Sequence, residues 1–104
     1  MAKANKKLVR QQFVNAVFKR DNNRCRMCGV RAGDAHHIIN RHEIINGGYV
    51  PENGISLCAG CHIKAEVWHS SGKTVWTPGY HPDDLFAVIS SNCVAALEAA
   101  RRLG

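Results

Sequence analysis

The stretch that decides the fold is "CRMCGVRAGDAHHII", residues 25–39, together with "ENGISLCAGCH", residues 52–62. Each stretch carries a Cys-x-x-Cys pair, Cys25 and Cys28 in the first and Cys58 and Cys61 in the second. A gap of two residues lets both sulfurs of a pair reach one ion, and two such pairs are the ligand set of a tetrahedral structural zinc site. Disulfide bonds and an iron–sulfur cluster are the alternatives. Two matched pairs favour zinc, because we expect a cytosolic chain, for reasons of sequence given below.

The 29 residues between the pairs exceed the simplest zinc-ribbon spacing, so we expect them to form a folded excursion. "AHHII" predicts a short strand, "NRHEIINGGYVPENG" a turn-rich loop, and "ISL" a second short strand. Residues 62–70, "HIKAEVWHS", predict a helix of about two turns. A shared zinc ion would hold these elements together in a core over residues 25–69.

Helices are predicted on both sides of this core. Val9, Phe13 and Val17 recur every four positions, which predicts an amphipathic helix over residues 8–20 behind a flexible basic tail of residues 1–7. Pro82 and the acidic residues after it suit the start of a second helix over residues 82–102, whose apolar face includes Cys93. We therefore expect a small α+β fold in one domain, residues 1–104.

The charge of the chain is uneven. Residues 1–31 carry nine Lys or Arg and one Asp, a net of +8, whereas residues 32–104 carry five basic and seven acidic residues, a net of −2. A basic third indicates a polyanionic partner, nucleic acid by default, although a merely solvated surface would look the same. We find no signal peptide and no apolar run of membrane-spanning length, so we expect a cytoplasmic protein with no membrane partner.

Two adjacent histidines, His36 and His37, stand within the first predicted strand. Neighbours on a strand point to opposite faces, so these two side chains have different tasks. If the cysteine pairs share an ion, His62 at the start of its helix faces this strand, and the three histidines converge. Such a cluster is typical of a second, open metal site. Lone histidines are more often structural, which is our interpretation of the others, His42, His69 and His81.

The pattern "C-x-x-C … DAHHII … ENGISLC-x-x-CH" resembles the zinc-containing branch of the HNH endonucleases, which belong to the ββα-metal (His-Me finger) nucleases. The resemblance covers residues 25 to about 69 and implies a ββα-metal motif. It assigns the catalytic divalent ion to His36 and His62 and the general base to His37. Asn53 would fasten the loop between the strands or approach the metal.

The resemblance implies a metal-dependent DNA endonuclease that uses Mg²⁺, Mn²⁺, Ni²⁺ or Zn²⁺ and leaves 5′-phosphate and 3′-hydroxyl ends. Asp34, two residues before His36, is a candidate to orient that imidazole. Candidates for phosphate contacts are the arginines nearest the site, Arg24, Arg26, Arg31 and Arg41. Few basic residues on the 62–70 helix could read bases, so we expect low sequence specificity.

Two other classes of function stay open. A non-catalytic zinc-ribbon DNA-binding module would explain the cysteines and the charge but leave the three histidines without a task. A purely structural or protein-interaction domain would also leave the basic third unexplained. We favour a monomer, with the last helix packed on the first, and so small a free-standing unit suggests a phage or mobile-element protein.

Overall fold

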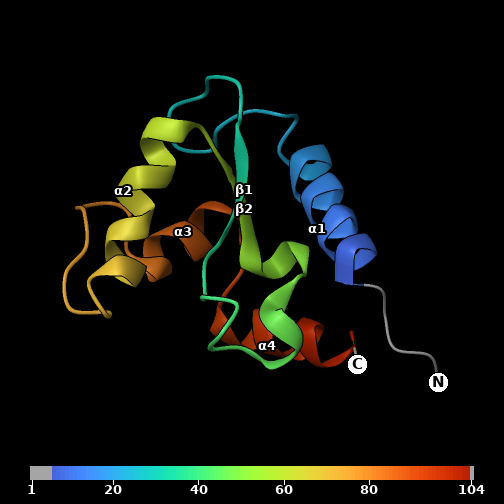
Figure 1. Ribbon diagram of the computed structural model, residues 1–104. Helices are drawn as coiled ribbons and strands as arrows, with labels where there is room; N and C mark the ends of the chain where they lie inside the picture. The colour runs from blue at the N-terminus through green and yellow to red at the C-terminus, as the bar shows by residue number, and fades with distance from the viewer. Residues whose placement is uncertain (1–5, 104) are drawn as a thin grey trace.

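The computed structural model describes residues 6–103. Within them the elements follow the order α1 (Lys6–Arg20), β1 (Asp34–His37), β2 (Gly54–Leu57), α2 (Ala59–Ser70), α3 (Pro82–Val88) and α4 (Cys93–Arg101), as Figure 1 shows. Two short 3₁₀ turns, Ile45–Gly48 and Pro51–Asn53, lie between the strands. The predicted class, a small α+β fold, is confirmed for this part of the chain, which has four helices and one two-stranded antiparallel sheet.

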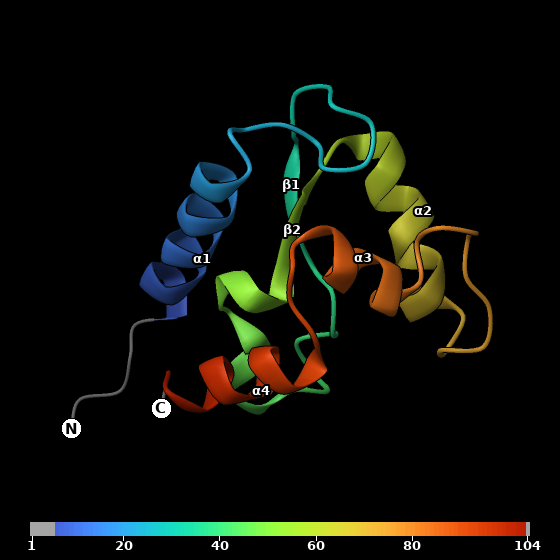
Figure 2. The same ribbon diagram turned by 180° about the vertical axis from the view of Figure 1, so that it is seen from behind.

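The two strands form the centre of the molecule, with α1 on one side and α2 on the other (Figures 1 and 2). The antiparallel register pairs His36 with Ile55 and His37 with Gly54. Apolar side chains from the hairpin, α2, α3 and α4 make the main core, in which Ile38, Ile55 and Leu57 are fully buried. This core fixes the strand that carries both histidines.

Helix α1 packs closely against β2. Its buried residues are Phe13 and Val17, two of the three predicted face positions. A Cβ atom at Gly54 would lie 2.6 Å from Val17 and 2.7 Å from Phe13, closer than side chains pack, so the contact requires glycine there. Helix α1 begins at Lys6, inside the predicted tail, and residues 1–5 of that tail lie outside the described residues.

A buried carboxylate joins α1 to the rest of the fold. Asp21 follows α1 directly and is 4% exposed. Its oxygens accept hydrogen bonds from Arg20 and Arg26 at 2.7–2.8 Å and from the backbone N–H of Ser56 at 3.0 Å. Asp21 thus connects α1 to β2 and to the loop that carries Cys25 and Cys28.

The single helix predicted over residues 82–102 is wrong, because the chain forms α3 and α4 with a turn between them. Ser90 has a left-handed backbone (φ 55°), and the Asn92 side chain accepts a hydrogen bond from the N–H of Ala95 at 2.9 Å, which caps the start of α4. The placement of Cys93 in the core is wrong for the same reason. The turn changes which residues of the following helix face the core, and it leaves Cys93 exposed.

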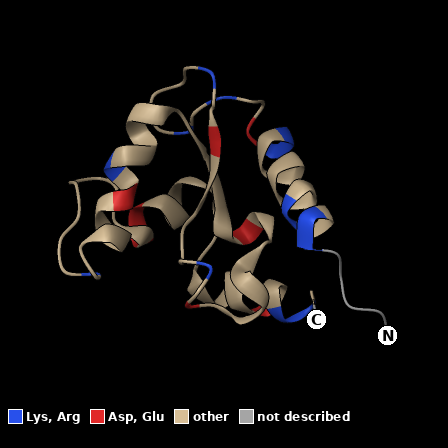
Figure 3. Cartoon of the chain, viewed as in Figure 1, with Lys and Arg blue, Asp and Glu red and all other residues tan. Residues whose placement is uncertain are grey.

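Lysine and arginine residues mark α1 and the loop that follows it (Figure 3), which is where the sequence concentrates positive charge. Acidic residues lie mainly on the hairpin, α2 and the C-terminal half. Among residues 6–103, no helix combines the length and the apolar character needed to cross a membrane.

Candidate functional site

The four predicted zinc ligands come together at one end of the hairpin. The sulfur atoms of Cys25, Cys28, Cys58 and Cys61 all lie within 4.8 Å of one another, and none of the four forms a disulfide. Gly29 turns the chain behind the first pair with a φ of 83°, a backbone conformation that favours glycine. The cluster fits a zinc site, which joins the loop after α1 to the start of α2.

The chemistry of the cluster suits a metal that binds thiolates. Burial raises the pKa of the Cys25 thiol, but backbone hydrogen bonds of Cys58, Cys28 and Met27 outweigh burial and lower the pKa to about 6. The sulfur of Cys58 accepts a hydrogen bond from the N–H of Cys61 at the start of α2. At Cys25 and Cys58, positioned N–H groups favour the deprotonated sulfur, which is the form that binds zinc, whereas the pKa values of Cys28 and Cys61 are raised.

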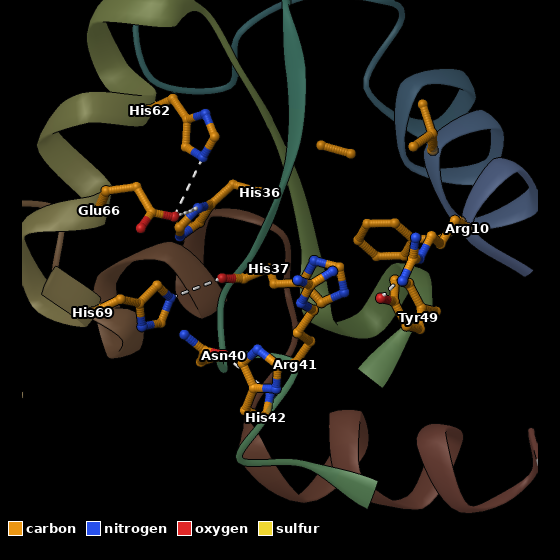
Figure 4. A pocket seen from close by; sticks show the side chains of 13 residues that line it. Arg10, His36, His37, Asn40, Arg41, His42, Tyr49, His62, Glu66 and His69 are labelled. Atoms are coloured by element: carbon orange, nitrogen blue, oxygen red, sulfur yellow. Dashed lines mark hydrogen bonds and ion pairs between the residues drawn. The ribbon is translucent and has the colours of Figure 1, made fainter. Parts of the chain in front are cut away.

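A second group of ligand atoms lies between β1 and α2. Atoms of His36, His62 and Glu66 lie within 4.8 Å of one another (Figure 4). Glu66 Oε1 is 3.4 Å from His36 Nδ1 and also 3.4 Å from His62 Nε2. His36 is 2% exposed, yet its Nδ1 makes no hydrogen bond. Two imidazoles and a carboxylate lie close together here, and one imidazole has a buried nitrogen that makes no hydrogen bond. This set of groups fits a divalent metal ion.

Glu66 is a candidate ligand that the sequence reasoning missed. His62 and Glu66 are four residues apart, so they share one face of α2, and this spacing could have identified the pair. Interaction with His36 lowers the pKa of Glu66 to about 2, against the opposing effect of burial. Burial lowers the pKa of His36, against the opposing effect of Glu66. Both shifts favour the unprotonated forms that bind metal.

Asp34 does not contact His36 as predicted, because its carboxylate reaches across to α2. Its Oδ2 lies 3.2 Å from His62 Nδ1 and accepts that hydrogen bond. The register explains the difference: Asp34 pairs with Leu57, and α2 starts only two residues later. With its Nδ1–H given to Asp34, His62 keeps the lone pair of Nε2 free on the side of Glu66.

His37 lies on the opposite face of β1, as the strand geometry predicted. Its ring stacks on Phe13 of α1 with centroids 4.5 Å apart and meets the edge of Tyr49 at 4.8 Å. Burial lowers the pKa of His37 to about 4, and the charges of His36 and Arg41 act in the same direction. The ring is therefore neutral at pH 7, and its Nε2 is buried without a hydrogen-bond partner.

Asn53 is buried and fully used in holding the loop. Its side-chain oxygen accepts from the N–H of Ile39 at 2.9 Å, and its Nδ2 donates to the carbonyls of Ile39 and Gly48 at 3.1 and 3.2 Å. The residue does not line the cavity that the histidines share. Of the two roles that the resemblance implied, these contacts support loop fastening, which makes Asn53 a positioning residue.

Three further histidines have separate positions. His69 on α2 donates from Nε2 to the carbonyl of His37 at 3.1 Å, and its ring lies against His36 with centroids 5.4 Å apart. His42 is exposed at the cavity edge. His81 accepts from the N–H of Asp83 at the start of α3, so it caps that helix. His69 and His81 thus have structural contacts, as expected.

The predicted arginines lie in three different surroundings. Arg26 donates to Asp21 and to the carbonyl of Val88 at 2.8 Å, so its guanidinium serves the fold and is not free for a phosphate. Arg24 and Arg31 are exposed on the loop before β1, where a backbone bridge pairs them, and neither lines the cavity. Arg41 is exposed and lines the cavity. Arg10 of α1 lines it too, and the sequence reasoning did not single it out.

A single cavity of about 480 Å³ connects the candidate metal ligands with His37. Its wall includes residues of α1, β1, the loop after β1 and α2, and Figure 4 shows their side chains converging from these four segments. The cavity thus joins a candidate divalent-metal site to a neutral imidazole across one strand.

A comparison with protein families matches residues 25–67 to the family described as HNH endonuclease. Comparisons with curated proteins and with solved structures gave no match. The match supports a nuclease-type function in general, with a nucleic acid as substrate, and it implies a divalent metal. The match contains all four clustered cysteines and the candidate ligands His36, His62 and Glu66, whereas α1, α3 and α4 lie outside it.

Proposed function

Because residues 25–67 match the HNH endonuclease family, we propose that the protein is a metal-dependent DNA endonuclease with His37 as its general base. One observation carries the proposal: candidate metal ligands on one face of β1 and a neutral imidazole on the other open onto the same cavity. A solely structural module needs the zinc cluster but has no use for this second arrangement.

His36, His62 and Glu66 would hold the divalent ion, Mg²⁺, Mn²⁺, Ni²⁺ or Zn²⁺. When bound, the ion supplies positive charge to the phosphate oxygens during phosphodiester hydrolysis. Asp34 keeps the ring of His62 in place through the 3.2 Å hydrogen bond to Nδ1. His69 ties α2, which carries two of the ligands, to the backbone carbonyl of His37. These hydrogen bonds hold the candidate ligands on α2 in a fixed position relative to His37 on β1.

His37 would take the proton of the attacking water. Its ring is neutral at pH 7 and its Nε2 makes no hydrogen bond, so no protein group competes for that nitrogen. Phe13 and Tyr49 fix the ring by packing. A phosphodiester entering the cavity brings negative charge, which raises the pKa of an adjacent imidazole toward the neutral range that suits a base. The products would carry 5′-phosphate and 3′-hydroxyl ends.

DNA would be held mainly through its backbone. Arg24, Arg31 and Arg41 are exposed and remain candidates for phosphate contacts, and affinity should fall steeply with salt. Of the exposed residues Ile63 and Lys64 on α2, only Lys64 carries side-chain donors that could reach base edges. We infer low sequence specificity from this.

The test is nicking of supercoiled plasmid by wild type and His37→Ala with Mg²⁺, Mn²⁺ or Ni²⁺ in turn. Glu98→Gln, an exposed α4 variant, is the control. We expect His37→Ala to lose at least about a hundredfold in rate while shifting DNA on a gel as wild type does. If no protein cuts with any ion while all bind DNA, the chain is a non-catalytic zinc-ribbon binding module. If His37→Ala cuts like wild type, the base assignment is wrong.

A further inference from the structure

Helix α1 contributes to the cavity although the family match begins only at residue 25. Arg10, Phe13 and Val14 of α1 all line it. Figure 4 shows Arg10 extending from α1 toward Tyr49, on the side of the strand to which His37 points. The cavity therefore has a wall built from a part of the chain that the family resemblance leaves unassigned.

Two guanidinium groups act on one phenol beside His37. Arg10 Nε donates to Tyr49 Oη at 3.3 Å, and its Cζ lies 5.9 Å from the centre of the Tyr49 ring. Burial raises the pKa of Tyr49, but Arg41 and Arg10 outweigh burial and leave the pKa below its ordinary value. Tyr49 itself meets the ring of His37 at 4.8 Å. Arg10, Arg41 and Tyr49 thus form one cluster beside the candidate base.

The positive charge of this cluster is not neutralised within the protein. Among residues 6–103, neither Arg10 nor Arg41 has a carboxylate within 4.0 Å. Arg20 and Arg26, by contrast, are both paired with Asp21. The acid nearest Arg41 along the chain, Glu43, is paired with Lys73. Two unpaired cations converging at a cavity wall are the typical arrangement for binding an anion.

The phenol at the centre of the cluster is held in place. Its ring packs edge-on against Phe13 with centroids 5.8 Å apart. A Cβ atom at Gly47, where φ is 75°, would lie 2.5 Å from the Tyr49 ring, so the close approach of this turn to the ring requires glycine. A donor fixed in this way loses little freedom when an anion binds.

We propose that Arg10, Arg41 and Tyr49 form a binding subsite for a phosphodiester group of the nucleic-acid strand. The subsite rests on the proposed nuclease function for its role and would be completed by α1. The scissile group must lie between the candidate metal ligands and His37, whereas this cluster lies on the α1 side of His37. It therefore binds a phosphodiester next to the one that is cut, and it positions the strand.

The kinetic experiment compares wild type with Arg10→Ala, Arg41→Ala and Tyr49→Phe on a DNA duplex. Arg101→Ala, which removes an exposed arginine on α4, is the charge-matched control. Loss of a charge-assisted hydrogen bond should raise KM by about 10- to 100-fold for each arginine variant, with kcat within about threefold. Each arginine variant should also reduce the slope of log K against log salt by about one. The control should change KM by less than twofold.

A binding experiment separates this proposal from the nuclease proposal. Inorganic phosphate, and then a short duplex without added divalent metal, are titrated while NMR follows the Tyr49 and His37 rings. If wild type shows saturable shifts that Arg10→Ala abolishes, the subsite stands even if no variant cuts DNA under any ion. If the arginine variants match Arg101→Ala in KM and in phosphate binding, the subsite is wrong, whether or not wild type cuts. A loss confined to kcat would likewise overturn the assignment to substrate binding.

Discussion

Replacing Asp21 with Asn tests the hydrogen bonds that hold α1 on the hairpin. The carboxylate accepts four hydrogen bonds, two from Arg20 and one each from Arg26 and the N–H of Ser56. Asparagine has nearly the same shape, but it offers one acceptor oxygen, and its amide would direct N–H groups at donors. The change therefore removes the charge and leaves donors around a buried site without acceptors.

The magnitude follows from the carboxyl pKa. Burial raises the pKa of Asp21, but hydrogen bonds from Arg20, Arg26 and Ser56 outweigh burial and lower it from 3.8 to about 2. At 1.36 kcal/mol per unit, this difference corresponds to about 2.5 kcal/mol of stability at pH 7. Because the folded-state pKa is the lower one, the contribution is complete above about pH 5 and is lost as the pH falls through about 4 to 2.

Urea unfolding at a fixed zinc concentration measures the effect. We expect Asp21→Asn to lose about 2–4 kcal/mol at pH 7, and the difference from wild type to stay constant between pH 6 and 8. Asp83→Asn, at an exposed carboxylate on α3, should lose less than about 1 kcal/mol. A loss below 1 kcal/mol for Asp21→Asn, or a difference that changes across pH 6–8, would refute the reasoning.

Three other substitutions test the zinc cluster, the second metal site and the loop. Cys58→Ser should abolish cooperative unfolding and lower bound zinc well below one equivalent, because zinc-binding energy is folding energy in so small a domain; unchanged melting and zinc content would contradict the cluster. Glu66→Gln should weaken Mn²⁺ binding in calorimetry by at least about tenfold with little change in melting temperature, and unchanged affinity would exclude Glu66 as a ligand. Asn53→Ala should cost about 2–4 kcal/mol in urea unfolding, since three hydrogen bonds of a fully buried side chain disappear, and a cost below 1 kcal/mol would contradict its fastening role.

Much of the core could be predicted because its signals are local in sequence. The two cysteine pairs have a spacing that brings thiolates to one ion, and the structure places all four sulfurs together. The period of a strand separates His36 from His37 without any tertiary information, and their ring contacts lie on opposite faces of β1. Turn residues on both sides of the strands predicted the hairpin.

The missed features depend on which side chains meet across elements. The partner of Asp34 depends on the register that puts Leu57 beside it, and no pattern along the chain specifies that register. Arg26 looks like a free surface charge until the fold brings Asp21 and the carbonyl of Val88 to it. The break at Ser90 was missed because the apolar spacing continues across it, while its conformation is fixed by tertiary contacts such as that of Ser91 Oγ with the Glu52 carbonyl at 2.8 Å.

The zinc cluster and the candidate base are joined by a short series of contacts. Arg26 lies between two of the zinc-site cysteines and donates to Asp21. Asp21 ends α1 and accepts from β2, and α1 in turn packs Phe13 on the ring of His37. Because each step is a direct hydrogen bond or a ring contact, the position of His37 depends on the same contacts of Asp21 that fix α1. A metal ion bound by the four cysteines would in this way stabilise the orientation of His37 as well as the fold.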